Sequence, residues 1–192
     1  MKTAAILLAA GRASRFGAAK LAADLGGQAL ASHAAKTLRQ LPLAAHIAVT
    51  SPATPDLTGL GFDCVTIDPP DAPLSRSLAL GVARALAGGA QQVLIALADM
   101  PFVPLAHFEA LLAASDGRGI ATISAGQAMP PALFGPEVIA ALQGVQGDHG
   151  ARQLLSQLPG VVLAPELALD IDTAADLASA EGYLRKLSSR NA

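Results

Sequence analysis

Short hydrophobic runs alternate with stretches of helical periodicity along most of the chain. The first run, Thr3–Ala9, is continuously apolar, as expected for a strand that is covered on both faces. The stretch Ala29–Leu41 carries its leucines at helical spacing instead, and Pro42 closes it. The repetition of this strand-and-helix pattern predicts the α/β class, with a Rossmann-like single domain in which helices flank a mostly parallel sheet.

The same periodicity places the remaining elements. Further strands are expected at Ala44–Thr50, Asp63–Asp68, Gln92–Ala98, Ile120–Ser124, Val161–Ala164 and Leu169–Ile171. Further helices are expected at Ser75–Ala87, with Ser75 as its cap, and at Pro104–Ala114, Pro136–Leu142, Ala151–Leu158 and Thr173–Leu187. Residues 1–187 are expected to form the domain and residues 188–192 a frayed tail. Because ligands of such sheets bind outside the carboxyl ends of the strands, we expect the functional residues in the segments that follow the strands.

Composition narrows the range of partners. The 13 Lys and Arg residues do not exceed the 15 Asp and Glu residues, and only 3% of residues are aromatic, so nucleic acid is not an expected partner. No apolar run near the N-terminus approaches the roughly 20 residues that span a bilayer, so no membrane association is expected. Cys64 is the single cysteine and has no partner for an internal disulfide. A cytoplasmic location is predicted.

The first group of candidate functional residues lies in the segment that follows the opening strand. Small residues at Ala9, Ala10 and Gly11 allow backbone amides to approach an anion closely. Arg12, Arg15 and Lys20 then place three of the thirteen cations within nine positions. Neither the dinucleotide pattern nor the P-loop pattern is present. The segment predicts a cradle for a polyanion such as a nucleoside triphosphate; the alternative is a solvated basic loop.

Carboxylates follow two later strands. Asp99 emerges from an apolar run at the ligand end of the sheet, where it could hold Mg²⁺, or could instead cap a turn before Pro101. Asp170 and Asp172 lie one residue apart, and one of them could approach the same metal. Asp176 with Thr173 matches a capping box, which favours a structural role for that pair.

Five stretches carry a family resemblance that extends from about residue 3 to residue 178. They are Leu8-Ala9-Ala10-Gly11-x-x-x-Arg15-Phe16-Gly17-x-x-Lys20, Ala98-Asp99-Met100-Pro101, Ser77-Leu78-x-x-Gly81, Gly147-Asp148-His149-Gly150-Ala151-Arg152, and Asp170-Ile171-Asp172-Thr173-x-x-Asp176-Leu177. Together they resemble the nucleotidyltransferases that act on molybdenum cofactor, which implies a nucleotide-diphospho-sugar transferase-like fold. The last two stretches resemble the cytidylyltransferase branch, whereas the guanylyltransferase branch typically has L-A-G-G at residues 8–11.

The resemblance implies a role for each matching position. The backbone of Leu8, Ala9, Ala10 and Gly11, together with Arg12, would hold the nucleotide. Arg15 and Lys20 would neutralise the triphosphate, and Asp99 would ligate Mg²⁺. Thr50, Asp68 and Ser77 match further nucleotide contacts; Asp68 and Ser77 could equally be a turn former and a first-turn helix residue. Asp148, as a helix N-cap, and Arg152 would face the substrate. The alternative is that Asp148 only caps the helix.

The reaction implied is transfer of a cytidylyl group from CTP to the terminal phosphate of a molybdopterin-type cofactor, for delivery to a recipient molybdenum enzyme. The alternatives are another nucleotide or a sugar-phosphate-like acceptor, and an accessory protein that binds the cofactor without catalysis. Ala13, Ala98 and Met129-Pro130-Pro131 depart from the family pattern. His33, His46 and His107 are scattered singly, and we expect them to be structural.

Overall fold

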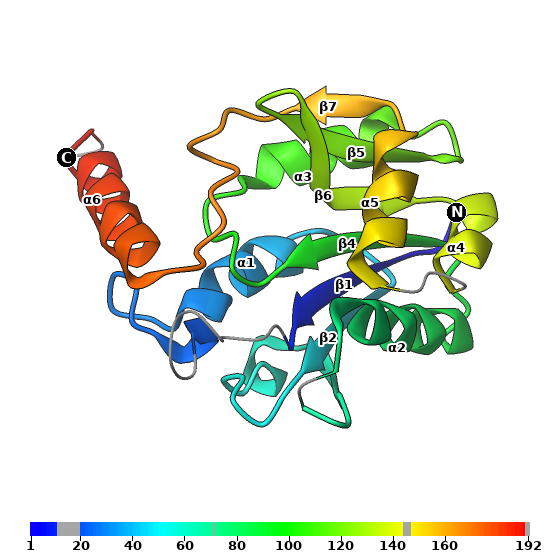
Figure 1. Cartoon of the computed structure of the whole chain (residues 1–192), viewed down its shortest axis with the longest axis horizontal. Helices are drawn as coiled ribbons and strands as arrows, with labels where there is room; N and C mark the ends of the chain where they lie inside the picture. Colours follow the sequence, from blue (N-terminus) through cyan, green and yellow to red (C-terminus); the bar gives the residue numbers. More distant parts are fainter. Residues whose placement is uncertain (11–19, 71, 144–146, 191–192) are drawn as a thin grey trace.

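The apolar run at the N-terminus forms an interior strand of a seven-stranded sheet. In the computed structural model, which describes residues 1–10, 20–70, 72–143 and 147–190, strand β1 (Thr3–Ala9) pairs in parallel with β2 (Ala45–Thr50) and β4 (Gln92–Leu97) (Figure 1). The strand order is β3-β2-β1-β4-β6-β5-β7. The outer strands are β3 (Asp63–Thr66), β5 (Gly119–Ser124), β6 (Gln127–Phe134) and β7 (Gly160–Val162). Since β6 alone among these strands runs against its neighbours, the prediction of a mostly parallel sheet is confirmed.

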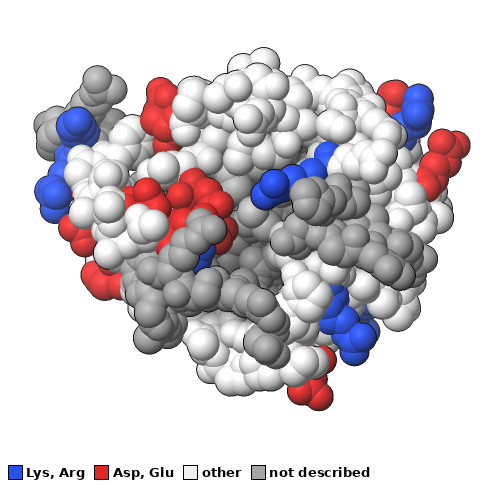
Figure 2. Space-filling model, in the orientation of Figure 1, with Lys and Arg blue, Asp and Glu red and all other residues white. Residues whose placement is uncertain are grey.

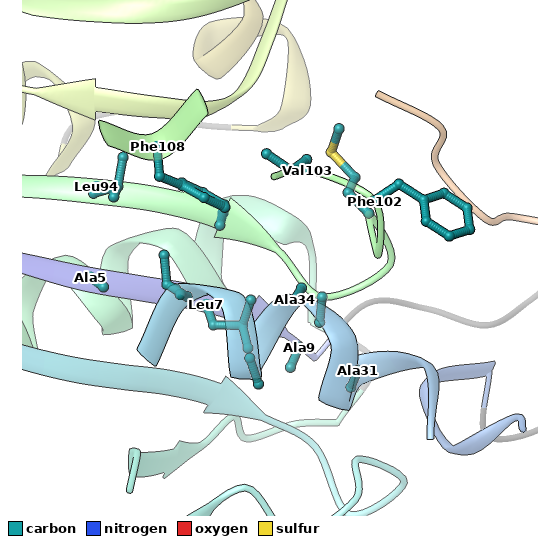
Figure 3. Packing of buried hydrophobic residues seen from close by; sticks show 14 of the residues in the cluster. Ala5, Leu7, Ala9, Ala31, Ala34, Leu94, Phe102, Val103 and Phe108 are labelled. Atoms are coloured by element: carbon teal, nitrogen blue, oxygen red, sulfur yellow. The ribbon is translucent and has the colours of Figure 1, made fainter. Parts of the chain in front are cut away.

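Helices cover both faces of the sheet, which explains why β1 is buried along its whole length. They are α1 (Leu30–Arg39), α2 (Leu74–Ala87), α3 (Leu105–Ala114), α4 (Pro136–Gln143), α5 (Gly147–Ser156) and α6 (Ala174–Arg190), with short 3-10 turns at Lys20–Ala22 and Thr58–Leu60. Alternate residues of β1 enter two separate cores. Figure 3 shows one core, in which Leu7 of β1 lies near Ala34 of α1 and Phe108 of α3. No helix of the described residues has the length and hydrophobicity needed to cross a bilayer.

The sequence-based elements differ from the structure where proline or local capping misleads the pattern. Strand β6 was not expected, because Pro130 and Pro131 interrupt its pattern; the structure places them at an irregularity in the β5–β6 register. The expected strand Leu169–Ile171 is wrong, since this segment is irregular. Ser75 is not a helix cap, because α2 begins at Leu74 and its N-cap is Pro73.

Two helix boundaries also move. Helix α5 begins at Gly147, so Asp148 lies within its first turn and the expected N-cap position is wrong. Helix α6 begins one residue after the expected Thr173 and continues to Arg190, beyond the expected start of the tail at residue 188. The side chains of residues 143–151 and 187–190 lie outside the described part of the structure.

Helix α2 lies unusually close to the sheet at Gly81. A Cβ atom at this position would lie 2.6 Å from Cγ2 of Ile6 and 3.0 Å from Cγ2 of Val49, both buried branched side chains of neighbouring strands. We expect Gly81→Ala to lower the free energy of unfolding by about 1–3 kcal/mol, because the helix must move away from the sheet. Denaturant unfolding monitored by circular dichroism measures this.

Gly182 of α6 provides the matched control for this substitution. A Cβ atom there would have no neighbour within 4 Å, so Gly182→Ala should raise stability by roughly 0.5–1 kcal/mol through helix propensity alone. Equal effects of the two substitutions would show that α2 tolerates displacement from the sheet.

A buried polar chain links α3 to the two strands at the irregular register. Nε2 of His107 donates to Oγ1 of Thr122 (2.8 Å), since the Thr122 hydroxyl donates its own proton to the carbonyl oxygen of Pro131 (2.6 Å). His107 is 5% exposed, and burial lowers its pKa below the usual value of 6.5. His107 is therefore neutral in the folded state and structural, as the sequence suggested.

This neutral histidine makes stability depend on pH. Below pH 6.5 the unfolded chain binds a proton that folded His107 does not accept, so its contribution to stability is full above that pH and declines as pH falls through it. We expect the free energy of unfolding of the native chain to fall more steeply from pH 7 to pH 5 than that of His107→Gln, by up to about 1.4 kcal/mol per pH unit. Urea titrations at the two pH values measure this free energy. An equal decrease for the native chain and for His107→Gln would contradict the prediction.

Candidate active site

The site lies where β1 and β4 end side by side. The amide of Ala98 donates to the carbonyl oxygen of Leu8 (3.1 Å), which extends the pairing of the two strands by one residue. Asp99 follows directly, with its side chain 19% exposed. The topology thus brings the segment after β1 and the segment after β4 to one edge of the sheet, where ligands of such folds bind.

Lys20 projects into this edge and contacts two carboxylates. Its Nζ atom lies 2.7 Å from Oδ2 of Asp99 and 3.0 Å from Oδ1 of Asp172, and its side chain is 6% exposed. Burial alone would lower the pKa of Lys20, but the two carboxylates outweigh it and raise the pKa above its usual value of 10.5. The ammonium group is therefore charged, and it is held at the ends of β1 and β4.

Asp99, Asp170 and Asp172 form an acidic group whose carboxylate oxygens all lie within 4.8 Å of one another. The amide of Ile171 donates to the carbonyl oxygen of Asp99 (3.1 Å), which holds the two segments together. Partial removal from water, followed by the negative charges of Asp99 and Asp172, raises the pKa of Asp170 to about 7. Figure 2 shows acidic side chains gathered on this face, near the segment that leads into α6.

The chemistry of this acidic group suits a hard divalent cation. Magnesium prefers one or two carboxylates and keeps water molecules for its remaining positions, so three convergent carboxylates are sufficient. The Lys20 ammonium already lies between two of them, which shows that the group accepts positive charge. Asp99 together with Asp170 or Asp172 is therefore a fitting donor set for Mg²⁺.

A tight turn fixes the position of Lys20. After the 3-10 turn Lys20–Ala22, the chain reverses through Gly26 and Gly27, whose φ angles of 64° and 86° favour glycine. Nε2 of His33 in α1 donates to the carbonyl oxygen of Leu25 (2.8 Å), and Nδ1 accepts from Nε2 of the Gln28 side chain (3.0 Å). His33 is thus structural, as expected, and it anchors the turn to α1.

The start of α6 fixes the two later acids. Oδ2 of Asp176 accepts from the amide (2.8 Å) and the hydroxyl (2.8 Å) of Thr173, and the amide of Asp176 donates back to Oγ1 of Thr173 (3.2 Å). This confirms the capping box. Further along α6, Tyr183 packs edge-on against Phe102, with ring centroids 4.9 Å apart. The helix therefore braces the segment that carries Asp99.

The other sequence-predicted residues divide into three groups. Leu8, Ala9 and Ala10 lie at the end of β1, and Thr50 is buried at the end of the neighbouring β2. Asp68 is exposed beyond β3, Ser77 is buried in the first turn of α2, and Arg152 is exposed on α5. Gly11, Arg12, Ala13 and Arg15, and the side chain of Asp148, lie outside the described residues.

Sequence reasoning missed Thr54. Its hydroxyl donates to the carbonyl oxygen of Ala9 (2.6 Å) at the end of β1 and accepts from the amide of Ser51 (2.9 Å). A threonine between two prolines in a polar stretch carries no motif, and only the closure of this loop onto β1 reveals its contact.

Comparison with known proteins agrees with the fold. The MobA-like NTP transferase domain family matches residues 5–161. Molybdenum cofactor guanylyltransferase of Cereibacter sphaeroides is 28% identical over 200 aligned residues, which cover 97% of this chain and 99% of the relative. The purine catabolism protein PucB of Bacillus subtilis is 28% identical over 161 residues, 78% of each chain.

The structural comparison gives the same family of folds. A nucleotidyl transferase from Methanothermobacter (Mth528) superposes with a TM-score of 0.80 at 25% identity and covers 96% of this chain and 99% of that one. The expected nucleotide-diphospho-sugar transferase-like fold is confirmed. The family match spans most of the chain, from residue 5 to residue 161. The chain belongs to the MobA-like NTP transferase domain family and is a nucleotidyltransferase.

Proposed function

We propose that the chain transfers a cytidylyl group from CTP to the terminal phosphate of a molybdopterin-type cofactor and releases pyrophosphate. The observation that carries this proposal is the contact of buried Lys20 with Asp99 and Asp172 at the ends of β1 and β4. The name of the Cereibacter relative supports the acceptor. Ala10, at a position where the guanylyltransferase branch typically has glycine, supports cytidine as the base.

The chemistry needs charge stabilisation more than proton transfer. A terminal phosphate oxygen of the acceptor is already anionic, so it attacks the α-phosphorus without a strong general base, and the bond to the pyrophosphate oxygen breaks. Lys20 and Arg15 would stabilise the charge of the triphosphate, and backbone amides after β1 would orient it. Mg²⁺, when held by Asp99 with Asp170 or Asp172, would neutralise phosphate charge.

Guanylyl transfer is the second candidate, and the relative named molybdenum cofactor guanylyltransferase favours it. It would use the same cation and acidic group and differ in the contacts to the base. An accessory protein that binds the molybdenum cofactor without turnover remains the non-catalytic alternative. Ala98 is the described departure that motivates this alternative, since it replaces a glycine beside Asp99. The product would pass to a recipient molybdenum enzyme in the cytoplasm.

Nucleotide competition tests the proposal directly. We expect CTP with Mg²⁺ to raise the Tm more than GTP, UTP or ATP, and to support pyrophosphate release only when the molybdopterin-type cofactor is added. A larger shift and turnover with GTP would replace cytidylyl by guanylyl transfer. Cofactor binding with no pyrophosphate release from any of the four nucleotides would identify an accessory protein.

A further inference from the structure

The end of β1 is held from both sides by groups in the segments that follow the neighbouring strands β4 and β2. On the β4 side, the carbonyl oxygen of Leu8 accepts from the amide of Ala98 (3.1 Å). On the β2 side, the carbonyl oxygen of Ala9 accepts from Oγ1 of Thr54 (2.6 Å). The last peptide units before the predicted anion cradle are therefore fixed on each flank.

The Thr54 hydroxyl is itself held in one orientation. The amide of Ser51 donates to its oxygen (2.9 Å), and the Ser51 hydroxyl lies 3.2 Å away. Because a carbonyl oxygen can only accept, the hydroxyl proton of Thr54 is committed to Ala9. The amide of Thr54 also donates to the carbonyl oxygen of Ser51 (3.0 Å), which closes the turn that brings the side chain back to β1.

This hydrogen bond controls a second group in the same peptide unit. The carbonyl of Ala9 and the N–H of Ala10 share one planar, trans peptide, so they point in opposite directions. With the carbonyl held towards β2, the N–H of Ala10 points towards the β4 side, from which Asp99 emerges. Ala10 is 4% exposed and is the first residue after β1.

We propose that Thr54 is a positioning residue that orients the Ala10 N–H to donate to a bound nucleoside triphosphate. The inference rests on the proposed nucleotide binding and extends it to a residue on another loop. Its contribution comes through the Ala9–Ala10 peptide, because the Thr54 hydroxyl proton is already donated within the protein.

Three variants separate positioning from general destabilisation. Thr54→Val keeps the shape of the side chain and removes the donor, and Thr54→Ser keeps the hydroxyl. Thr58→Val is the matched control, because the Thr58 hydroxyl donates to Oδ1 of exposed Asp56, close to Thr54 in the sequence. We expect Thr54→Val to raise the Kd and KM for CTP or GTP with Mg²⁺ about tenfold at unchanged kcat. Thr54→Ser should recover most of this loss, and Thr58→Val should show none.

The amide resonance of Ala10 gives a readout that is independent of nucleotide. In the ¹⁵N–¹H spectrum of the free chain it should move in Thr54→Val and stay in place in Thr58→Val. Native nucleotide affinity in Thr54→Val, an unmoved Ala10 resonance, or a fall in kcat at unchanged KM would each overturn the inference. A native chain that binds none of the four nucleotides would refute the proposed function and with it this role, whatever the resonance does.

Discussion

Lys20→Met is expected to reduce kcat/KM for pyrophosphate release by about two to three orders of magnitude. The methionine keeps most of the apolar stem but removes the positive charge that Lys20 places against Asp99 and Asp172. A preorganised charge at a developing phosphate charge contributes about this much in enzymes of known mechanism. The measurement is a coupled pyrophosphate assay with CTP, Mg²⁺ and the molybdopterin-type acceptor.

Lys36→Met is the control for this experiment. Lys36 is exposed on α1, and its Nζ atom donates to Oε1 of Gln28, so its removal takes away one positive charge without touching the acidic group. We expect turnover close to that of the native chain. Lys20→Met should also lower the Tm in the absence of metal, since the acidic group loses its counter-charge. Native turnover in Lys20→Met would remove Lys20 from the proposed mechanism.

Asp99→Asn is expected to weaken divalent-metal binding at least tenfold and to lower kcat by about two orders of magnitude at saturating nucleotide. The amide is nearly isosteric with the carboxylate but carries no charge, and Asp99 is the member of the acidic group that lies at the end of β4. Titration of Mn²⁺ followed by electron paramagnetic resonance measures binding without any turnover. Chelation with EDTA should abolish activity of the native chain, and added Mg²⁺ should restore it.

The same titration distinguishes the second ligand. Asp170→Asn and Asp172→Asn each remove one carboxylate, and the larger loss of Mn²⁺ affinity identifies the residue that completes the site with Asp99. Asp63→Asn is the control, because Asp63 of β3 is exposed and its Oδ2 atom pairs with Nε of Arg84 on α2 (2.8 Å). Equal Mn²⁺ affinity in the native chain and in Asp99→Asn would show that the acidic group binds no metal through Asp99.

The central strands and the meeting of Lys20 with Asp99 could be predicted because simple rules govern both. A continuously apolar run must be covered on both faces, and carboxyl ends of neighbouring parallel strands meet at one edge. The sequence raised a metal contact for Asp170 or Asp172 only as a possibility and placed the two acids at the end of a strand. The structure shows an irregular segment whose Ile171 amide reaches Asp99.

Other features could not be predicted because they depend on long-range packing. Strand β6 forms despite Pro130 and Pro131, since its later residues pair with both β4 and β5 and bury a regular apolar face. Thr54 acquires its role only when its loop folds back onto β1. In both cases the local pattern favours a loop, and contacts with distant strands decide the outcome.

The residues after position 161 determine how far the chain can be shortened without loss of the site. The family match ends at residue 161, yet Asp170, Asp172 and the helix that braces Phe102 all lie beyond it. A chain cut after residue 161 would keep β1 and β4 but leave Lys20 opposite a single carboxylate. The segment that matches the family is therefore shorter than the segment needed to bring Lys20 together with Asp99, Asp170 and Asp172.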